Sequence, residues 1–457
     1  MPTITAPSSV QIPTTKPGAS INVDCSSGAT VRVDWVGPGG ITGSRTVKNI
    51  AEDVPAGISL PDSCTFTLTA LDGTATYTGP MLGDSLQGLV SGAGSPVSAL
   101  NYIAALPKWR KALGGALAGQ AAARILFAGD STTAGMNSSG ATRALSPAHL
   151  AGRLLSSAGV PVNTMIGFGD ATKAGGSTFT TFDARWTVPA AWATPSNVAT
   201  VGGFALLNST DTSTLAFAPG TGSSNQFDSF EIFYVINTGY GTFTVNVDGG
   251  ATLATINSAG TRALGRQIVP CTLGNHAINI ARNGTGGAVI IIGIVPRNSA
   301  APSVEIYNGG IGGATLADLS QSGGQFLYGD VAASIAPHLT VCDIGINDRR
   351  TTTYAASWAT SLQALLTTYQ ATGDVVACLP VPSALSYSAF TTQANQDAYD
   401  AAISATAAAL GIPVWSKRAR LGTYEIANPQ GLYSDTLHPS NAGYAAQALD
   451  LSRLLLG

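Results

Sequence analysis

The sequence has few charged residues and no concentration of one sign. Only 10% of its 457 residues are Asp, Glu, Lys or Arg, and 22 basic residues nearly balance 25 acidic ones. Typical soluble domains carry roughly 25% charged residues. No run of Lys or Arg supplies the basic footprint with which proteins bind phosphate backbones. Nucleic acid is therefore not expected as a partner. A polar surface built from Gly, Ser and Thr is common in extracellular and virion proteins.

Long apolar runs are also absent. The longest, AVIIIGIVP at 288–296, is less than half as long as a membrane-spanning helix, which needs about 20 residues. It predicts a buried strand, and no membrane insertion is expected. The N-terminal stretch MPTITAPSSVQIPTT has neither the basic nor the apolar region of a secretory signal.

Metal-binding and paired-thiol motifs are missing as well. The five cysteines form no CxxC pair, and the four histidines lie far apart in the sequence. We therefore expect neither a metal nor a cofactor. The cysteines read as small buried hydrophobic residues. A disulfide between Cys25 and Cys64, within one N-terminal domain, is the alternative.

The chain is too long for a single ordinary core, so several domains are expected. Residues 1–82 alternate in polarity between frequent turn residues, which predicts a small β-sandwich. Residues 83–119 read as a linker followed by a helix interrupted by a proline. Strands alternate with helices in 120–169 and 304–457, so these segments predict one α/β domain with a doubly wound parallel sheet. Between them, 170–303 contains only short strands and predicts an inserted all-β module, sandwich- or jelly-roll-like.

Gly-Asp-Ser occurs twice, ending at Ser85 and at Ser131. Ser131 follows the apolar strand ARILFAG and so falls at the carboxyl edge of the predicted sheet, where open α/β folds bind ligands. Ser85 has no buried strand before it and lies in the predicted linker. The position favours Ser131 as a nucleophile, with an ordinary loop serine as the alternative.

A nucleophilic serine needs a base and a group that orients the base. The stretch YSDTLHPSNAGY supplies Asp435 and His438, three positions apart and just before the last predicted helix. One turn can bring the carboxylate to Nδ1 of the ring and leave Nε2 facing a serine. In the alternative reading this segment only starts the helix, with Ser440 as its cap, and both readings can hold together.

Donors for a developing oxyanion are predicted at two further strand ends. DIGINDRR places Asn347 after a buried strand, and NGGIGGATL places Gly310 and Gly313 after another. A glycine lets a backbone N–H approach the reacting oxygen without obstruction. Taken singly, these stretches read as a turn and a flexible loop. Arg349 and Arg350 could contact an acidic sugar, or only water.

Together these stretches resemble the SGNH hydrolase superfamily, also called GDSL esterases, over 120–167 and 304–457. The resemblance implies the doubly wound α/β fold. It implies that Ser131 is the nucleophile and its N–H the first oxyanion donor. Gly313, or less well Gly310, would be the second donor, and Asn347 the third. Asp435 and His438 would complete the triad.

The spacing departs from the family pattern, because far more residues separate Ser131 from Gly313 than the usual few dozen. The inserted module accounts for the excess. Such an insertion resembles phage-tail and bacterial carbohydrate O-deacetylases. That resemblance implies a serine esterase that removes O-acetyl or other short acyl groups from an acetylated bacterial surface polysaccharide. It also implies a place in a virion tail with other phage tail proteins, as a homotrimer, or else an extracellular or cell-surface location.

Two other functions remain open at this stage. One is a glycan-binding virion or surface protein without turnover, in which the β modules would be the working parts. The other is a lipid or small-ester hydrolase. Aromatic residues of the insertion could stack on sugars or pack in its own core: Trp186, Trp192, Tyr234 and Tyr240.

Overall fold

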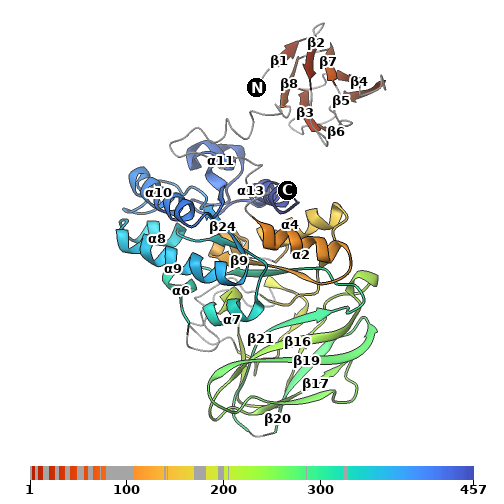
Figure 1. Ribbon diagram of the computed structural model, residues 1–457, viewed down its shortest axis with the longest axis vertical. Coiled ribbons are helices and arrows are strands. Elements are labelled where there is room, and N and C mark those ends of the chain that lie inside the picture. Colours follow the sequence, from red (N-terminus) through yellow and green to blue (C-terminus); the bar gives the residue numbers. More distant parts are fainter. Residues whose placement is uncertain are drawn as a thin grey trace. The chain divides into compact units, whose positions relative to one another are not determined.

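The computed structural model divides into two compact units, Met1–Ser98 and Ala99–Gly457 (Figure 1). The structure describes residues 106–137, 143–168, 182–193, 200–202, 205–284, 286–322 and 328–456 with their side chains. It describes the strands between residues 3 and 78, Gly140–Ala141 and Gly203 by their backbone alone. Each unit is treated by itself below.

The described residues of the first unit form two antiparallel four-stranded sheets, in the orders β1-β8-β3-β6 and β2-β7-β4-β5. All eight strands fall in the range for which a β-sandwich is predicted. The predicted linker with Ser85 and the side chains of Cys25 and Cys64 lie outside the described residues. The strands are β1 (Thr3–Thr5), β2 (Ser9–Pro13), β3 (Ser20–Cys25), β4 (Thr30–Val36), β5 (Thr42–Lys48), β6 (Ala56–Ser59), β7 (Thr65–Asp72) and β8 (Thr74–Thr78).

The second unit contains a six-stranded sheet in the order β12-β22-β9-β23-β24-β25, and every pairing in it is parallel. The predicted parallel sheet is confirmed. The strands before the inserted part, β9 and β12, are not neighbours in this sheet. Strand β22, which follows the inserted part, lies between them. The strands are β9 (Ala123–Gly129), β12 (Val162–Asn163), β22 (Val304–Gly310), β23 (Leu339–Asp343), β24 (Asp374–Leu379) and β25 (Val414–Ser416).

Helices cover both faces of this sheet, as a doubly wound fold requires (Figure 1). Successive residues of β9 point to opposite faces, so Ile125 joins one buried cluster and Leu126 joins another. The cluster around Ile125 includes residues of α2 (Pro107–Leu117), α4 (Pro147–Ser157) and α13 (Asn441–Leu456). The cluster around Leu126 includes residues of α6 (Leu316–Leu319), α7 (Tyr328–Ile335), α9 (Ala356–Thr372) and α10 (Gln393–Ala409).

Helix starts follow local capping rules. Ser146 caps α4 by accepting the His149 N–H, with a proline in the first turn. In the predicted helical stretch around Pro107, α2 begins at this residue, and the predicted part before Leu106 lies outside the described residues. Proline is tolerated there since the first helical N–H has no intrahelical partner. Shorter elements are α3 (Ser131–Ala134), α8 (Ile346–Thr351), α11 (Lys417–Leu421), α12 (Tyr424–Ala427), β10 (Met136–Asn137), β11 (Gly140–Ala141) and the 3₁₀ turns Arg143–Leu145, Val201–Gly203, Ser223–Asn225 and Asn428–Gln430.

Between β12 and β22 the chain forms two antiparallel sheets, in the orders β13-β15-β20-β17-β18 and β14-β21-β16-β19. One buried cluster draws side chains from both sheets, so they face each other over a common core. Trp186, Trp192 and Tyr234 belong to this core and are buried. Tyr240 is half-buried against the neighbouring cluster. The strands are β13 (Trp186–Thr187), β14 (Leu206–Asn208), β15 (Thr214–Phe217), β16 (Phe227–Ile236), β17 (Thr242–Val247), β18 (Ala254–Asn257), β19 (Ala263–Gly274), β20 (Ile278–Asn283) and β21 (Val289–Arg297).

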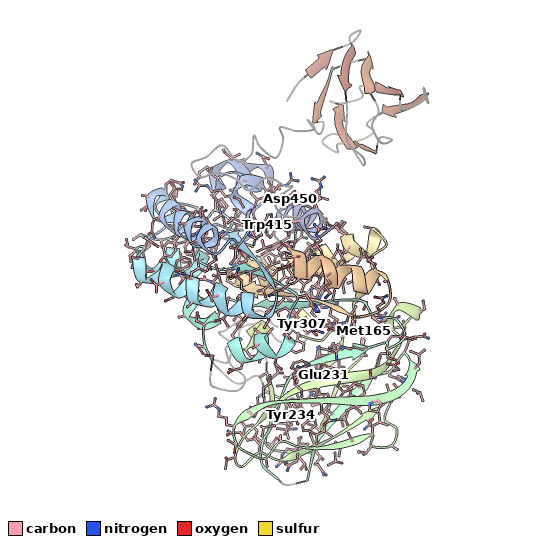
Figure 2. The ribbon with its side chains drawn as sticks, in the orientation of Figure 1. Met165, Glu231, Tyr234, Tyr307, Trp415 and Asp450 are labelled. Atoms are coloured by element: carbon pink, nitrogen blue, oxygen red, sulfur yellow. The ribbon has the colours of Figure 1, made fainter. Side chains whose placement is uncertain are left out.

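The sheet that contains β16 and β21 also packs against the parallel sheet. Phe233 and Ile292 from these strands lie in the same buried cluster as Leu126 and Tyr307. Tyr307 lies where the two parts meet, while Glu231 and Tyr234 lie within the inserted part (Figure 2). Among the described helices, none combines the length and apolarity that crossing a membrane requires.

Candidate active site

Ser131 is the first residue of α3, immediately after the turn that ends β9. Asp130 caps this helix, and its Oδ1 accepts the Thr132 N–H at 2.9 Å. A Cβ at Gly129 would lie 2.1 Å from Thr133 Oγ1 and 2.5 Å from the Asp343 carbonyl oxygen, so the turn requires glycine there. The structure therefore places Ser131 at the carboxyl edge of the central strand, as predicted.

His438 and Asp435 lie in the loop before α13 and meet Ser131. His438 Nε2 is 3.0 Å from Ser131 Oγ, and His438 Nδ1 is 2.9 Å from Asp435 Oδ2. Asp435 Oδ1 also accepts the backbone N–H groups of Leu437 and His438, at 2.7 and 2.6 Å. These bonds hold the carboxylate at Nδ1 of the ring and leave Nε2 for the serine. Ser440 accepts the Gly443 N–H at the start of α13, so the capping alternative holds as well.

The surroundings of Asp435 favour its charged form. Burial works against ionisation of Asp435, but hydrogen bonds from the His438 side chain and from two backbone N–H groups outweigh it and lower the pKa of this carboxyl below its ordinary value. A carboxylate in this place holds the Nδ1–H tautomer and stabilises the imidazolium that forms when the ring takes a proton.

Three strand ends bring candidate oxyanion donors to this point. Register pairs Gly129 of β9 with Gly310 of β22 and with Asp343 of β23, so the three strands end level with one another. Ser131, Gly313 and Asn347 follow these ends. Their convergence lies where the strand order reverses around β9, which is the usual ligand site of open α/β sheets.

The structure separates the two candidate glycines. The N–H of Gly310 already donates to Asn308 Oδ1 at 3.0 Å, and a Cβ there would lie 2.2 Å from the Ala134 nitrogen. Gly310 is thus a packing glycine beneath α3. Gly313 adopts a φ of +78°, a Cβ on it would meet no atom within 4 Å, and its N–H has no partner among the described residues. Its amide is the one free to bind a substrate oxygen.

Asn347 and Asp348 together hold the turn that carries Gly313. Asn347 Nδ2 donates to the Ala314 carbonyl at 2.7 Å, which leaves its second amide hydrogen for a substrate. The Asp348 carboxylate accepts the Leu316 N–H at 3.2 Å and the Trp358 Nε1–H at 2.9 Å. Burial raises the pKa of Asp348. Sequence reasoning did not assign this clamp to Asp348.

A buried charge cluster that the sequence did not reveal lies behind the serine. Asp343, at the end of β23, accepts Thr133 Oγ1–H at 2.8 Å and forms an ion pair with Lys417. Asp130 lies beside it, and burial followed by the charge of Asp343 raises the pKa of Asp130 to about 7. Among the described residues, Asp130 Oδ2 and Asp343 Oδ1 are buried and have no hydrogen-bond partner. The charge of Lys417 also acts on Asp130 and opposes the rise of its pKa.

The two arginines after Asp348 have structural partners. Arg349 is buried, donates to the Val381 carbonyl and lies 3.4 Å from Asp400, so contact with an acidic sugar is wrong for this residue. Arg350 bonds the Tyr387 hydroxyl and lies 5.1 Å from the centre of its ring. Within the described part of the chain, no group of His, Cys, Asp and Glu is arranged to hold a metal ion.

The remaining histidines lie away from the triad and have local partners. His149 contacts the cap residue Ser146, and His338 Nδ1 accepts the Arg124 N–H. His276 lies in the turn between β19 and β20, where it pairs with Asp248 at 2.6 Å. None of the three is part of the site.

Residues 293–446 match the model of the GDSL-like Lipase/Acylhydrolase family. This range holds Gly313, Asn347, Asp435 and His438, while Ser131 precedes it on the far side of the inserted strands. A search of curated protein sequences gave no match.

Several solved structures are similar. A peptidoglycan O-acetylesterase is 18% identical with a TM-score of 0.55, and the likeness covers 76% of this chain and 94% of that one. A family two carbohydrate esterase from Clostridium thermocellum, in complex with cellohexaose, is 13% identical over 54% and 92% with a TM-score of 0.28. An acetylxylan esterase from Geobacillus stearothermophilus is 20% identical over 34% and 73% with a TM-score of 0.27. At these identities, the first of the three supports a shared fold.

Proposed function

We propose that this chain, a carboxylic ester hydrolase with a GDSL (SGNH) hydrolase domain, removes O-acetyl groups from a polysaccharide through an acyl-enzyme. The observation that carries the proposal is the contact of Ser131 Oγ with His438 Nε2 at 3.0 Å, at the sheet edge that β22 shares before the turn with Gly313. The fold likeness to a peptidoglycan O-acetylesterase supports the choice of a carbohydrate ester.

The proposed reaction begins with transfer of the Ser131 proton to His438 Nε2 as Oγ attacks the ester carbonyl carbon. Asp435, held charged by its hydrogen bonds, stabilises the imidazolium. The carbonyl oxygen becomes an oxyanion that accepts from the N–H groups of Ser131 and Gly313 and from the Asn347 amide. His438 then returns the proton to the departing sugar oxygen, which leaves acetyl-Ser131. Water, activated by the same ring, releases acetate.

The two Gly-Asp-Ser sequences offer a matched test. Ser131→Ala should abolish release of acetate from a small acetyl ester and from O-acetylated glycans, whereas Ser85→Ala should leave both unchanged. Equal acetate release by the two variants would refute the assignment. A serine-reactive phosphonate should label the wild type at Ser131, and absence of label would favour a glycan-binding protein without turnover.

The acyl group and the sugar are tested together. Mass spectrometry of acetate loss from a panel of O-acetylated bacterial glycans, run beside hydrolysis of short- and long-chain esters, compares the candidate substrates. Acetate loss from one or more glycans is the expected result. Faster turnover of long-chain esters than of every glycan would instead identify a lipid hydrolase.

The proposal extends to a place in a virion tail, as a homotrimer with other tail proteins. It draws on the low charge content and on the all-β strands of the first unit. Light scattering on the purified full chain checks the assembly, with three copies per particle expected. A monomer at working concentration would contradict the trimer.

A further inference from the structure

A loop of residues 380–392 joins β24 to α10 and touches both sides of the site. The Ala384 N–H donates to the Thr436 carbonyl at 2.9 Å, inside the segment that carries Asp435 and His438. Four residues later, Ser388 Oγ donates to the Arg350 carbonyl at 2.7 Å, on the helix that carries Asn347. The 380–392 loop therefore borders the ester site between the triad base and an oxyanion donor.

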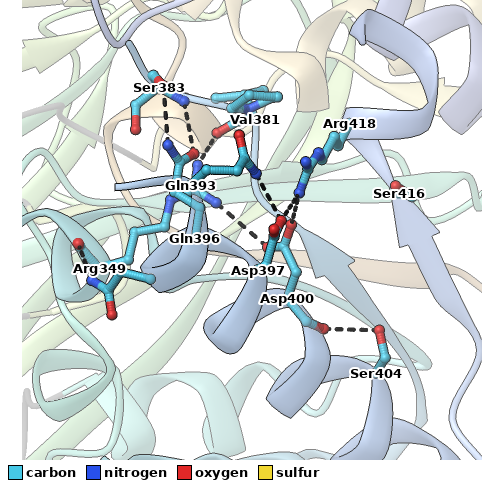
Figure 3. Close-up of polar contacts among 12 residues, drawn as sticks. Arg349, Val381, Ser383, Gln393, Gln396, Asp397, Asp400, Ser404, Ser416 and Arg418 are labelled. Atoms are coloured by element: carbon cyan, nitrogen blue, oxygen red, sulfur yellow. Dashed lines mark hydrogen bonds and ion pairs between the residues drawn. The ribbon is translucent and has the colours of Figure 1, made fainter. Parts of the chain in front are cut away.

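Buried polar contacts hold the base of this loop (Figure 3). Gln396 of α10 accepts the Ser383 N–H at 3.3 Å and donates to the Ser383 carbonyl at 3.2 Å. Arg349 donates to the Val381 carbonyl and contacts Asp400, which also lies 3.3 Å from Arg418. A loop held in this way presents its side chains without a large ordering cost when a ligand binds.

The same loop exposes a short row of apolar side chains. Leu385, Tyr387 and Phe390 are 42%, 38% and 42% exposed, respectively. Arg350 holds the Tyr387 ring through its hydroxyl and its face. Exposed apolar side chains that gather on one loop are a feature of binding surfaces.

Beyond Phe390 the surface is hollowed. A depression of about 310 Å³ is lined by Phe390, Tyr354, Asn395 and small side chains. Its size is at the lower end of the range for small-ligand sites. The loop thus contacts the segment of Asp435 and His438 at Ala384 and borders the concave site at Phe390.

We propose that Leu385, Tyr387 and Phe390 bind the sugar units that flank the esterified one, so that the glycan chain runs from Ser131 toward the hollow beside Phe390. This inference rests on the proposed function. A pyranose ring has an apolar C–H face and a polar rim. An exposed aromatic ring can cover that face while the hydroxyls stay in water, and a tyrosine hydroxyl adds a polar contact. The row accordingly favours longer chains over single acetylated sugars.

The test measures binding as a function of chain length. Ser131→Ala protein, which cannot turn over its ligand, is titrated calorimetrically with O-acetylated xylobiose and xylohexaose and with O-acetylated muropeptide monomer and dimer. The longer member of at least one pair should bind about tenfold more tightly. Adding Phe390→Ala or Tyr387→Ala should remove most of that gain. The matched control is Ile268→Ala, at a 58% exposed apolar residue on β19 of the inserted part, which should keep the gain.

Three results would overturn the inference: equal affinity for short and long chains in both series, a gain that survives both loop substitutions, or a gain lost in Ile268→Ala. The last would move glycan binding to the inserted strands. The proposed function is tested separately, by measuring ester hydrolysis with the protein that retains Ser131. If it hydrolyses a small acetyl ester but releases no acetate from any glycan, deacetylation is rejected whatever the titrations show.

Discussion

Replacing Lys417 by methionine tests whether the charge cluster behind Ser131 is as tightly buried as the structure indicates. The ammonium forms an ion pair with Asp343, and the two side chains are 1% and 4% exposed. Methionine has a similar unbranched length, so the change removes a charge with little change in volume. Two carboxyl groups, Asp343 and Asp130, then remain buried with no cation between them.

The expected cost follows from the burial. Removing one partner of a buried ion pair leaves an uncompensated charge and destabilises a protein by about 3–5 kcal/mol. The burial of both carboxyl groups keeps them from solvent, which could otherwise screen the charge that the ammonium leaves behind. We therefore expect Lys417→Met to lower the free energy of unfolding by about 3–5 kcal/mol. For a unit as long as Ala99–Gly457, the corresponding fall in the melting temperature is roughly 4–7 °C.

The double variant Lys417→Met with Asp343→Asn separates charge from packing. An asparagine oxygen can still accept the Thr133 hydroxyl hydrogen, so the neutral pair should regain most of the lost stability. The coupling energy between the two sites should be about 2 kcal/mol or more. Differential scanning calorimetry of the full chain provides the measurement. A loss below about 1 kcal/mol in the single variant, or additive losses in the double variant, would refute the reasoning.

Two further predictions concern the same edge of the sheet. Asn347→Ala should lower kcat on a small acetyl ester by about 10²–10³-fold. Asn347→Asp should be no better, because a carboxylate cannot donate a hydrogen bond. A loss under about fivefold would show that Asn347 is not an oxyanion donor. Asp130 ionises near its ordinary pKa when unfolded but only at about 7 when folded, so the native state binds the extra proton and stability falls as pH rises between these values. Asp130→Asn keeps the cap and should therefore gain stability relative to the wild type from pH 4 to pH 8 in urea titrations, and a constant difference would contradict the shift.

The sequence predicted well the position of the candidate site residues that follow the ends of strands. Ser131, Gly313 and Asn347 follow three apolar runs, and parallel strands bring their carboxyl ends to one edge. The three-residue spacing of Asp435 and His438 likewise defines a local turn. Local spacing and strand order were enough to predict that these five residues come together, and their roles in catalysis stay predictions.

What could not be predicted depends on pairs that are distant in sequence. In the sequence, Lys417 resembles any surface lysine at the start of a short helix. Only the pairing of β25 with β24 brings its side chain to Asp343. Arg349 was expected to contact an acidic sugar or only water, but Asp400 of α10 pairs with it. Gly310 and Gly313 cannot be told apart from composition. The difference lies in what a Cβ would meet, which is the backbone of α3 in one case and open space in the other.

The inserted strands raise the question of how a module can separate Ser131 from the rest of its site without disturbing it. Parallel strands such as β12 and β22 need a crossover connection, usually a helix packed on the sheet. Here the module is that connection, since it leaves after Asn163 and returns at Val304, which pairs with Val162. Its sheet covers the face that a helix would cover, with Phe233 and Ile292 against Leu126 and Tyr307.

Ionic contacts strengthen the contact between the module and the parallel sheet at the start of β22. Arg297 of β21 reaches Glu231 of β16 at 2.8 Å and Glu305 of β22 at 2.5 Å, and Glu305 also accepts the Tyr307 hydroxyl hydrogen at 2.8 Å. Both carboxylates are nearly fully buried, so the module and the strand must move together. Because β22 ends at Gly310 and leads into the turn with Gly313, the module supports one side of the candidate site. The insertion is therefore a structural part of the second unit, and residues on either side of it still come together although the insertion is long.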